Sequence, residues 1–130
     1  MTRQAIQTNG APVALGPYSQ GIRSGDLVFC SGQLGLDPAT GELVGEGIAE
    51  QTERALTNLG NVLRAAGLGF ADVAKTTCFL AEMGDFGAFN EVYARFFGEP
   101  HPARSTFAVK ALPKGARVEI EAIAQRPSAR

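Results

Sequence analysis

The hydrophobic positions of this chain fall into short strand-like runs and two longer helical runs, which Gly and Pro clusters separate. Six strands are predicted, at residues 2–8, 18–23, 27–31, 73–81, about 103–111 and about 117–125. The first is expected to be an edge strand. The second and third are joined by a Gly-containing connection at residues 24–26, which is typical of a hairpin. The fourth is rich in β-branched residues, as strands are.

Two segments instead repeat their apolar residues at helical spacing. In the first, small and apolar residues recur from Ile48 to Ala66, and Gly67 is expected to end the helix, with Leu68 as the apolar residue after the glycine. Five residues are predicted to form its solvent-exposed face, namely Glu50, Glu53, Arg54, Asn58 and Arg64. The second helix is expected to have Asp85 as its cap and Gly98 as its terminator. We interpret its aromatic stripe as core.

The element order is therefore β-β-β-α-β-α-β-β, which predicts a single α+β domain over residues 1–130. Two helices can cover only one face of a sheet of about six strands. Several strands, at 27–31, 73–81 and 118–124, are nevertheless apolar at odd and even positions, which indicates burial on both faces. We expect a closed homo-oligomer with any far-face pocket at a subunit boundary. The alternative is an open face that docks a different protein.

Composition and charge limit the partners. The chain has 130 residues, 45% of them hydrophobic and 19% charged, and a formal net charge of −1. With this net charge the protein has no excess of positive charge to attract nucleic acid or anionic lipid, so neither is expected as a partner. No segment approaches the ~20 apolar residues that cross a bilayer, and the first residues lack the pattern of a signal peptide. A cytoplasmic protein is predicted.

The residues that usually build metal and nucleophilic sites are scarce here. Cys30 and Cys78 lie in apolar runs and are interpreted as buried, reduced residues. With His101 as the single histidine, a zinc site with the usual ligand number is not expected, and His101 is assigned to a loop. The glycine-rich pieces at 16–21 and 31–35 match no nucleotide-binding motif. No cofactor and no metal are therefore predicted, and Ser31 has no context of a catalytic nucleophile.

Two charged residues near the C-terminus are the main functional candidates. Arg104 and Glu119 both lie in near-continuous apolar, strand-like runs. A guanidinium is always charged and presents a rigid fork of donors, so burial of Arg104 would imply a planar anion such as a carboxylate. The alternative is a side chain that faces solvent or forms an exposed ion pair of little energetic value. The other groups that could bind a small anion are Tyr18, Ser31, the amide of Gly32 and the strand around Thr106.

These residues belong to motifs that occur together in one known family. The most specific motifs are Pro102–Phe107, Lys110–Pro113 and Val118–Ala122, supported by Gly16–Gln20 and Phe29–Gln33. In this order they resemble the RidA (YjgF) family of small reactive-intermediate deaminases, and the resemblance spans essentially the whole chain. It implies a chorismate-mutase-like α+β fold that assembles as a homotrimer with three clefts between subunits.

The resemblance also implies roles for individual residues. Arg104 would hold the substrate carboxylate, and Glu119 would position or activate water. Ser31 and the Gly32 amide would line the same pocket, and Tyr18 would close one side of it. Two further positions match the family, namely Asn90, whose role is less defined, and Thr106, which stands where many deaminating members have cysteine.

The substrates that the resemblance implies are 2-imino acids, such as 2-iminobutanoate and 2-iminopropanoate, and their enamine tautomers. Their hydrolysis to 2-oxo acids and ammonia needs a positioned water and proton transfers, without a covalent nucleophile. Three alternatives remain: a trimeric binder or sensor of small carboxylates without catalysis, a protein-interaction module, and a deaminase of larger amino-substituted unsaturated acids.

Overall fold

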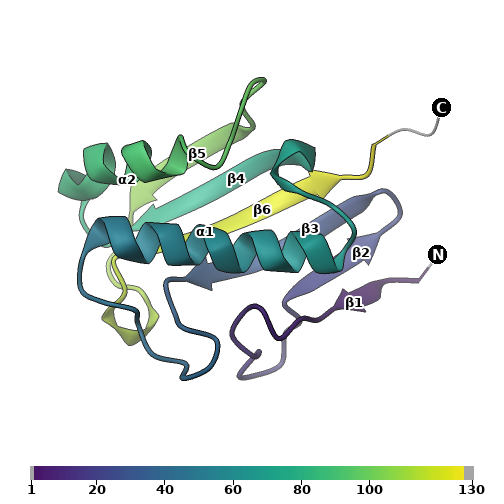
Figure 1. Cartoon of the computed structure of the whole chain (residues 1–130), viewed down its shortest axis with the longest axis horizontal. Coiled ribbons are helices and arrows are strands. Elements are labelled where there is room, and N and C mark those ends of the chain that lie inside the picture. The colour runs from purple at the N-terminus through teal and green to yellow at the C-terminus, as the bar shows by residue number, and fades with distance from the viewer. Residues whose placement is uncertain (1, 128–130) are drawn as a thin grey trace.

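The structure, a computed structural model, describes residues 2–127. Six strands form one mixed sheet, and two helices pack on it (Figure 1). The strands are β1 (Gln4–Ile6), β2 (Gly21–Ser24), β3 (Leu27–Leu34), β4 (Val73–Leu80), β5 (Ala103–Ala108) and β6 (Val118–Gln125). The helices are α1 (Ile48–Ala65) and α2 (Phe86–Tyr93), and short 3₁₀ turns occur at Phe70–Asp72, Met83–Asp85 and Pro113–Gly115. The predicted order of strands and helices and the α+β class are confirmed.

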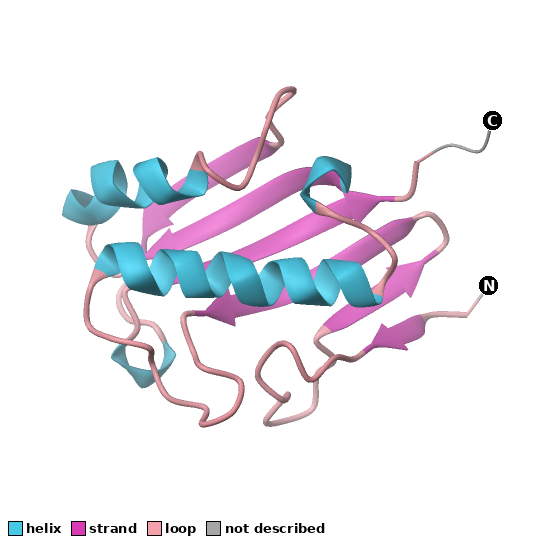
Figure 2. Ribbon diagram, viewed as in Figure 1, coloured by secondary structure: helices cyan, strands magenta, loops and turns pink. Residues whose placement is uncertain are grey.

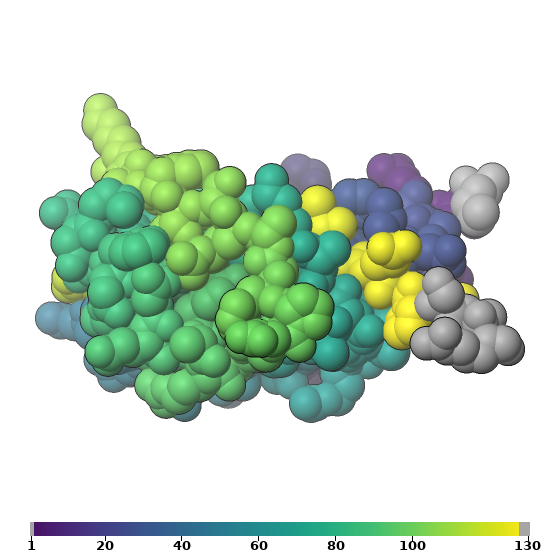
Figure 3. Space-filling view, turned by 90° about the horizontal axis from the view of Figure 1, so that it is seen from above, coloured from purple at the N-terminus to yellow at the C-terminus, as the bar shows by residue number. Residues whose placement is uncertain are grey.

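The sheet has the order β1-β2-β3-β6-β4-β5. Strands β1 to β3 form the expected antiparallel meander, and Gly25 adopts φ +62° in the turn between β2 and β3. Strand β6 lies between β3 and β4 and is antiparallel to both, whereas β5 runs parallel to β4 and forms the second edge of the sheet. Figure 3 shows the molecule from the β5 side, with the green surface of α2 and β5 beside the yellow of β6.

Both helices lie on the same face of the sheet, in front of it in Figures 1 and 2. The core therefore forms between the helices and the inward-facing positions of β3, β4 and β6. Its fully buried members include Val28, Leu56, Leu59, Leu63, Leu80, Phe89, Val118 and Ile120. Within residues 2–127, no helix combines the length and the hydropathy that crossing a membrane requires.

The predicted end of α1 is confirmed. Gly67 has φ +79°, and its N–H donates to the carbonyl of Arg64 at 2.9 Å. The N–H of Leu68 donates to the carbonyl of Leu63, also at 2.9 Å. This pair of hydrogen bonds is the Schellman motif, which a residue with a Cβ would adopt only with strain.

Three predictions about the helices were wrong. Asn58 is fully buried rather than on the solvent-exposed face. Its side-chain amide donates to the carbonyls of Leu34 (3.2 Å) and Leu36 (2.9 Å), which connects α1 to the end of β3. Asp85 makes no capping hydrogen bond, since its carboxylate accepts from the guanidinium of Arg117. Helix α2 also ends at Tyr93, before the predicted Gly98, and continues as single turns.

The cysteines and the histidine lie as predicted. Cys30 and Cys78 are buried free thiols, and burial raises the pKa of Cys30 to about 12 and that of Cys78 to about 11. Both thiols therefore stay protonated and unreactive near neutral pH. His101 is exposed in the loop before β5.

The sheet face away from the helices has no cover in the single chain. Along β3 and β6, buried and more exposed residues alternate, so burial on both faces is not found here. Phe29 is 42% exposed and Phe107 is 45% exposed, and Phe79 packs edge to face against Phe107 at 5.3 Å between ring centroids. We call this side the open face. The predicted homo-oligomer stays a prediction, and the open face is where it would need its partner.

Candidate functional site

Glu119 projects from β6 onto the open face, beside an irregularity of β3. The pairing of β3 with β6 shifts between Cys30 and Gln33, so that Ser31 and Gly32 together lie opposite one residue of β6. A Cβ on Gly32 would overlap the carboxylate of Glu119. Glycine at this position therefore gives the carboxylate its room against the strand.

A cavity of about 810 Å³ surrounds this carboxylate. Four of the predicted site residues line it, namely Tyr18, Ser31, Gly32 and Glu119. Tyr18 is 54% exposed, and the hydroxyl of Ser31 donates to the carbonyl of Ser19 at 2.6 Å. The predicted proximity of these four residues is thus found within one chain.

The cavity also contains two charged residues that the sequence reasoning missed, Glu121 and Lys114. Glu121 could have been found from the two-residue period of a strand, which places it on the same face as Glu119. Lys114 has φ +60° in the turn before β6, a backbone conformation that no simple sequence signal predicts for lysine.

The environment of Glu119 changes its acidity. Its side chain is half-buried, and burial, followed by the nearby negative charge of Glu121, raises its pKa. A carboxyl group whose pKa lies above its ordinary value is better matched to proton transfer near neutral pH.

This raised pKa predicts a pH-dependent stability cost. Because the folded state favours protonated Glu119, its ionisation destabilises the protein once the pH rises above the unfolded pKa, and increasingly so up to the folded pKa. Glu119→Gln should therefore raise the Tm at pH 7, and the gain should vanish near pH 4, where the carboxyl is protonated in both states. Thermal melts of both proteins from pH 4 to pH 8 measure the difference, and a gain that is independent of pH would contradict the prediction.

The second group of predicted residues lies around Arg104 on β5. The Nη1 of Arg104 donates to Oδ1 of Asn90 at 2.8 Å. Thr106, two residues along the strand, has a buried hydroxyl oxygen without a hydrogen-bond partner in the described part of the chain. Asn90 and Arg104 are thus brought together by α2 and β5, although 14 residues separate them in sequence.

The expected burial of Arg104 is not found, because β5 is an edge strand and the residue is exposed in the single chain. The guanidinium is nevertheless in contact with the protein. Its carbon lies 4.8 Å from the ring centroid of Tyr93, 5.5 Å from that of Phe86 and 5.7 Å from that of Phe89. Among residues 2–127, no carboxylate forms a salt bridge with Arg104, so the alternative of an exposed ion pair is not found. The other alternative, a side chain that faces solvent, matches the exposure of Arg104 in the single chain.

The two groups lie on opposite faces of the sheet. Arg104 is level with Thr76 of β4, which is fully buried under α2, where its hydroxyl contacts that of Tyr93 at 2.7 Å. Glu119 is level with Phe79, on the open face. Because paired residues of neighbouring strands point to the same side, a single chain does not bring Arg104 and Glu119 together.

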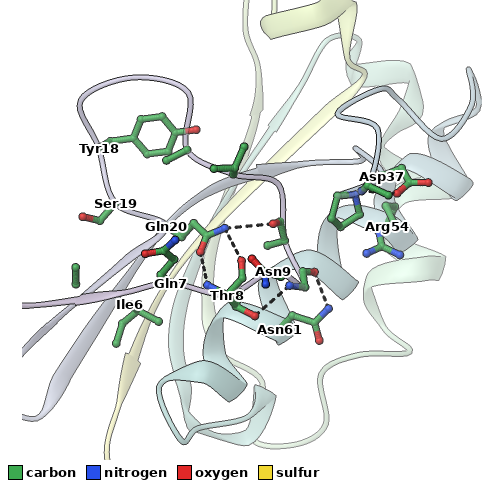
Figure 4. Close-up of a pocket in the computed structure, with 17 residues that line it drawn as sticks. Ile6, Gln7, Thr8, Asn9, Tyr18, Ser19, Gln20, Asp37, Arg54 and Asn61 are labelled. Atoms are coloured by element: carbon green, nitrogen blue, oxygen red, sulfur yellow. Dashed lines mark hydrogen bonds between the residues drawn. The ribbon is translucent and has the colours of Figure 1, made fainter.

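A second cavity, of about 760 Å³, adjoins the first and shares Tyr18 and Gln20 with it (Figure 4). The side chain of Gln20 accepts from the N–H of Thr8 at 2.7 Å and donates to the carbonyl of Pro12 at 2.8 Å. The amide of Asn61 on α1 donates to the carbonyl of Gly10 at 2.7 Å. These bonds tie the two ends of the Tyr18 loop to each other and to α1. Strand β2 begins after this loop, at Gly21 rather than at the predicted residue 18.

In residues 2–127, no group of three or more His, Cys, Asp or Glu side chains is placed to hold a metal ion.

The chain is similar to proteins of a known family. Residues 8–126 match the family model described as Endoribonuclease L-PSP. The 2-iminobutanoate/2-iminopropanoate deaminase of Mus musculus is 52% identical over 94% of this chain and 90% of its own length. Reactive Intermediate Deaminase A, chloroplastic, of Arabidopsis thaliana is 51% identical over 94% of this chain, which spans 65% of that protein's length.

A solved structure gives the same relation. The crystal structure of E. coli TdcF with bound serine superimposes with a TM-score of 0.91 and is 42% identical in sequence. The match covers 95% of this chain and 99% of TdcF. The likeness therefore extends over nearly the whole chain.

Proposed function

This chain belongs to the Endoribonuclease L-PSP family, also known as the RidA (YjgF) family, and we propose that it hydrolyses 2-iminobutanoate and 2-iminopropanoate to 2-oxo acids and ammonia. The observation that carries the proposal is the arrangement of Arg104, whose guanidinium is held by Asn90 and by aromatic rings without a carboxylate partner in residues 2–127. Such a group is ready to accept the carboxylate of a small acid. The mouse relative's name supports the same reaction.

We propose a homotrimer as the active form. The apolar open face needs a cover, and the opposite placement of Arg104 and Glu119 leaves each with half of a site. In a cyclic assembly, the Glu119 cavity of one subunit faces the β5 edge of the next, so that the partner subunit's Arg104 completes the site. Three equivalent clefts result from this arrangement.

In the proposed mechanism, Arg104 binds the substrate carboxylate through a pair of N–H donors, while Asn90 occupies another donor. The carbon of the imine, which is electrophilic because its nitrogen is protonated, then faces a water molecule held by Glu119. Water adds to the carbon as Glu119 accepts its proton, which gives a carbinolamine. Return of that proton to nitrogen lets ammonia leave. The carbinolamine hydroxyl gives its own proton to the Glu119 carboxylate at the same time, which forms the carbonyl of the 2-oxo acid.

The remaining pocket residues have supporting roles in this proposal. Ser31 and the Gly32 amide line the cleft beside Glu119, and Tyr18 closes one side. Thr106 takes part through its backbone, so that threonine in place of the common cysteine leaves the reaction intact. The substrates come from pyridoxal-phosphate dehydratases acting on serine or threonine, so the protein limits metabolite damage in the cytoplasm. The proposal requires no metal or cofactor.

A coupled assay tests the proposed reaction. A threonine dehydratase releases the imine, and the rate of 2-oxobutanoate formation is followed with and without this protein. We expect faster formation with the wild-type protein. Binding of 2-oxobutanoate without any acceleration would favour a carboxylate sensor instead, and imines of aromatic amino acids in the same assay test the larger substrates. Incubation with RNA tests the activity that the family description names.

Mixed assemblies test whether the site is shared between subunits. Arg104→Ala and Glu119→Gln are each expected to be inactive alone. When the two variants are co-expressed in equal amounts, roughly a quarter of the clefts combine an intact Arg104 with a partner's intact Glu119, so about that fraction of activity should return. If both residues acted within one chain, the mixture would stay inactive. The mass of the wild-type protein in solution checks the trimer.

A further inference from the structure

The aromatic rings beneath Arg104 form a defined surface. Tyr93, Phe86 and Phe89 all belong to α2, and each has its ring centroid within 5.7 Å of the guanidinium carbon. Tyr93 is the nearest, at 4.8 Å. Aromatic faces attract cations, so these three rings, which we call the aromatic platform, stabilise a guanidinium lying over them.

The platform is anchored in the protein core, in contrast to the exposed arginine that it carries. Tyr93 is 7% exposed, and its ring packs against Phe97 with centroids 4.5 Å apart. Its hydroxyl shares a hydrogen bond of 2.7 Å with Thr76 of β4. Burial raises the pKa of Tyr93, so its phenol stays neutral. The ring nearest to Arg104 therefore has a fixed position and orientation.

The anchoring matters because little else restrains the guanidinium. The residue is exposed on an edge strand, and its single hydrogen bond within residues 2–127 is to Asn90. One of five N–H donors is thus used, which leaves four for a ligand. One hydrogen bond fixes a point of the group but not its plane, and the plane decides whether two parallel donors meet a carboxylate.

We propose that Tyr93, supported by Phe86 and Phe89, is a positioning residue that sets the plane of the Arg104 guanidinium for two-point binding of a carboxylate. Tyr93 does not touch the substrate and acts through Arg104 alone. The inference rests on the proposed function for the identity of the carboxylate, and it assigns the ring rather than the hydroxyl of Tyr93 as the active part.

Three variants separate the ring from the hydroxyl and from general packing. Tyr93→Leu removes the ring, Tyr93→Phe keeps the ring and removes the hydrogen bond to Thr76, and Phe96→Leu is the matched control. Phe96 follows α2 and packs edge to face against Phe70 at 5.5 Å, so its loss also weakens the aromatic core. Affinity for 2-oxobutanoate is measured by calorimetry, and KM and kcat by the coupled assay, below the Tm of each variant.

We expect Tyr93→Leu to raise the Kd and the KM by roughly 3- to 30-fold, the range that corresponds to a cation–π contact. Tyr93→Phe and Phe96→Leu should stay within about 2-fold of the wild type, because both leave a ring under the guanidinium. An unchanged Kd in Tyr93→Leu would overturn the proposal. An equal loss in Tyr93→Phe or in Phe96→Leu would also overturn it, because the effect would then come from packing.

A spectroscopic readout keeps this test separate from the deaminase assignment. Protons above an aromatic face are shifted upfield, so the side-chain N–H signals of Arg104, assigned by their loss in Arg104→Lys, should move downfield in Tyr93→Leu and stay in place in Phe96→Leu. If the wild type fails to accelerate imine hydrolysis, the proposed function fails while this signal still reports the platform. If the signal does not move, the platform fails whatever the activity.

Discussion

Replacing Arg104 by alanine is expected to lower kcat/KM for 2-iminobutanoate by roughly 10³-fold, and replacing it by lysine by roughly 30-fold or more. The estimate rests on hydrogen bonds to a charged group, which contribute about 1.5–3 kcal/mol each, and alanine removes two of them. Lysine keeps the charge but presents a compact ammonium that cannot reproduce the planar fork or lie flat on the aromatic platform. Steady-state kinetics in the dehydratase-coupled assay measure both losses.

Stability measurements and a second arginine serve as controls for this prediction. Because Arg104 is exposed and lies on an edge strand, neither substitution should change the Tm by more than a few degrees. Arg95 is another exposed arginine, in the turns that follow α2, and Arg95→Lys should leave the kinetics unchanged. Full activity of Arg104→Lys would show that two-point binding by a guanidinium is not required.

The largest expected loss of stability comes from Gly35→Ala. Gly35 is buried directly after β3, and a Cβ at this position would lie 2.6 Å from the carbonyl oxygen and 2.7 Å from the Cα of Gln51. These are backbone atoms of α1, so no flexible side chain can move aside. Overpacking of this kind costs about 1–3 kcal/mol. We expect a value near the upper limit, because the backbone at Gln51 is held in place.

Gln51 is held by both ends of its side-chain amide. Its Nε2 donates to the carbonyl of Gly45 at 2.8 Å, and its Oε1 accepts from the N–H of Arg117 at 2.8 Å. A retreat of α1 would strain both bonds, and Gln51 is 1% exposed, so water could not replace them easily.

Denaturant and thermal unfolding measure the effect, which for a domain of this size corresponds to a Tm lower by about 10 °C. Gly87→Ala is the matched control. Gly87 lies in α2 with no heavy atom within 4 Å of an added Cβ, so alanine there should stabilise the protein by up to about 1 kcal/mol through its helix propensity. Equal stability of Gly35→Ala and the wild type would mean that α1 can shift without cost.

Much of the local structure could be predicted because it depends on neighbours in sequence. The end of α1 at Gly67 and Leu68 follows from the need for a left-handed residue and an apolar contact, and both are visible in the sequence. Asn58 was misassigned for the opposite reason. The carbonyls that its side chain binds are more than twenty residues away in sequence, so its position in the helix alone indicated that it was exposed to solvent. Asp85 was misassigned in the same way, since its partner is Arg117.

The sequence by itself determined the order of strands and helices, the α+β class, the buried thiols and the set of residues that resemble a deaminase site. The tertiary structure alone decided that Glu119 lies on the open face, that Arg104 lies exposed on the platform of α2, and that the two are on opposite sides of the sheet. The physical reason is that alternation along a strand shows which residues share a face of that strand. Whether a residue of β5 and a residue of β6 lie on the same face of the sheet depends on how both strands pair with β4. These pairings join residues far apart in sequence, so no local sequence pattern predicts them.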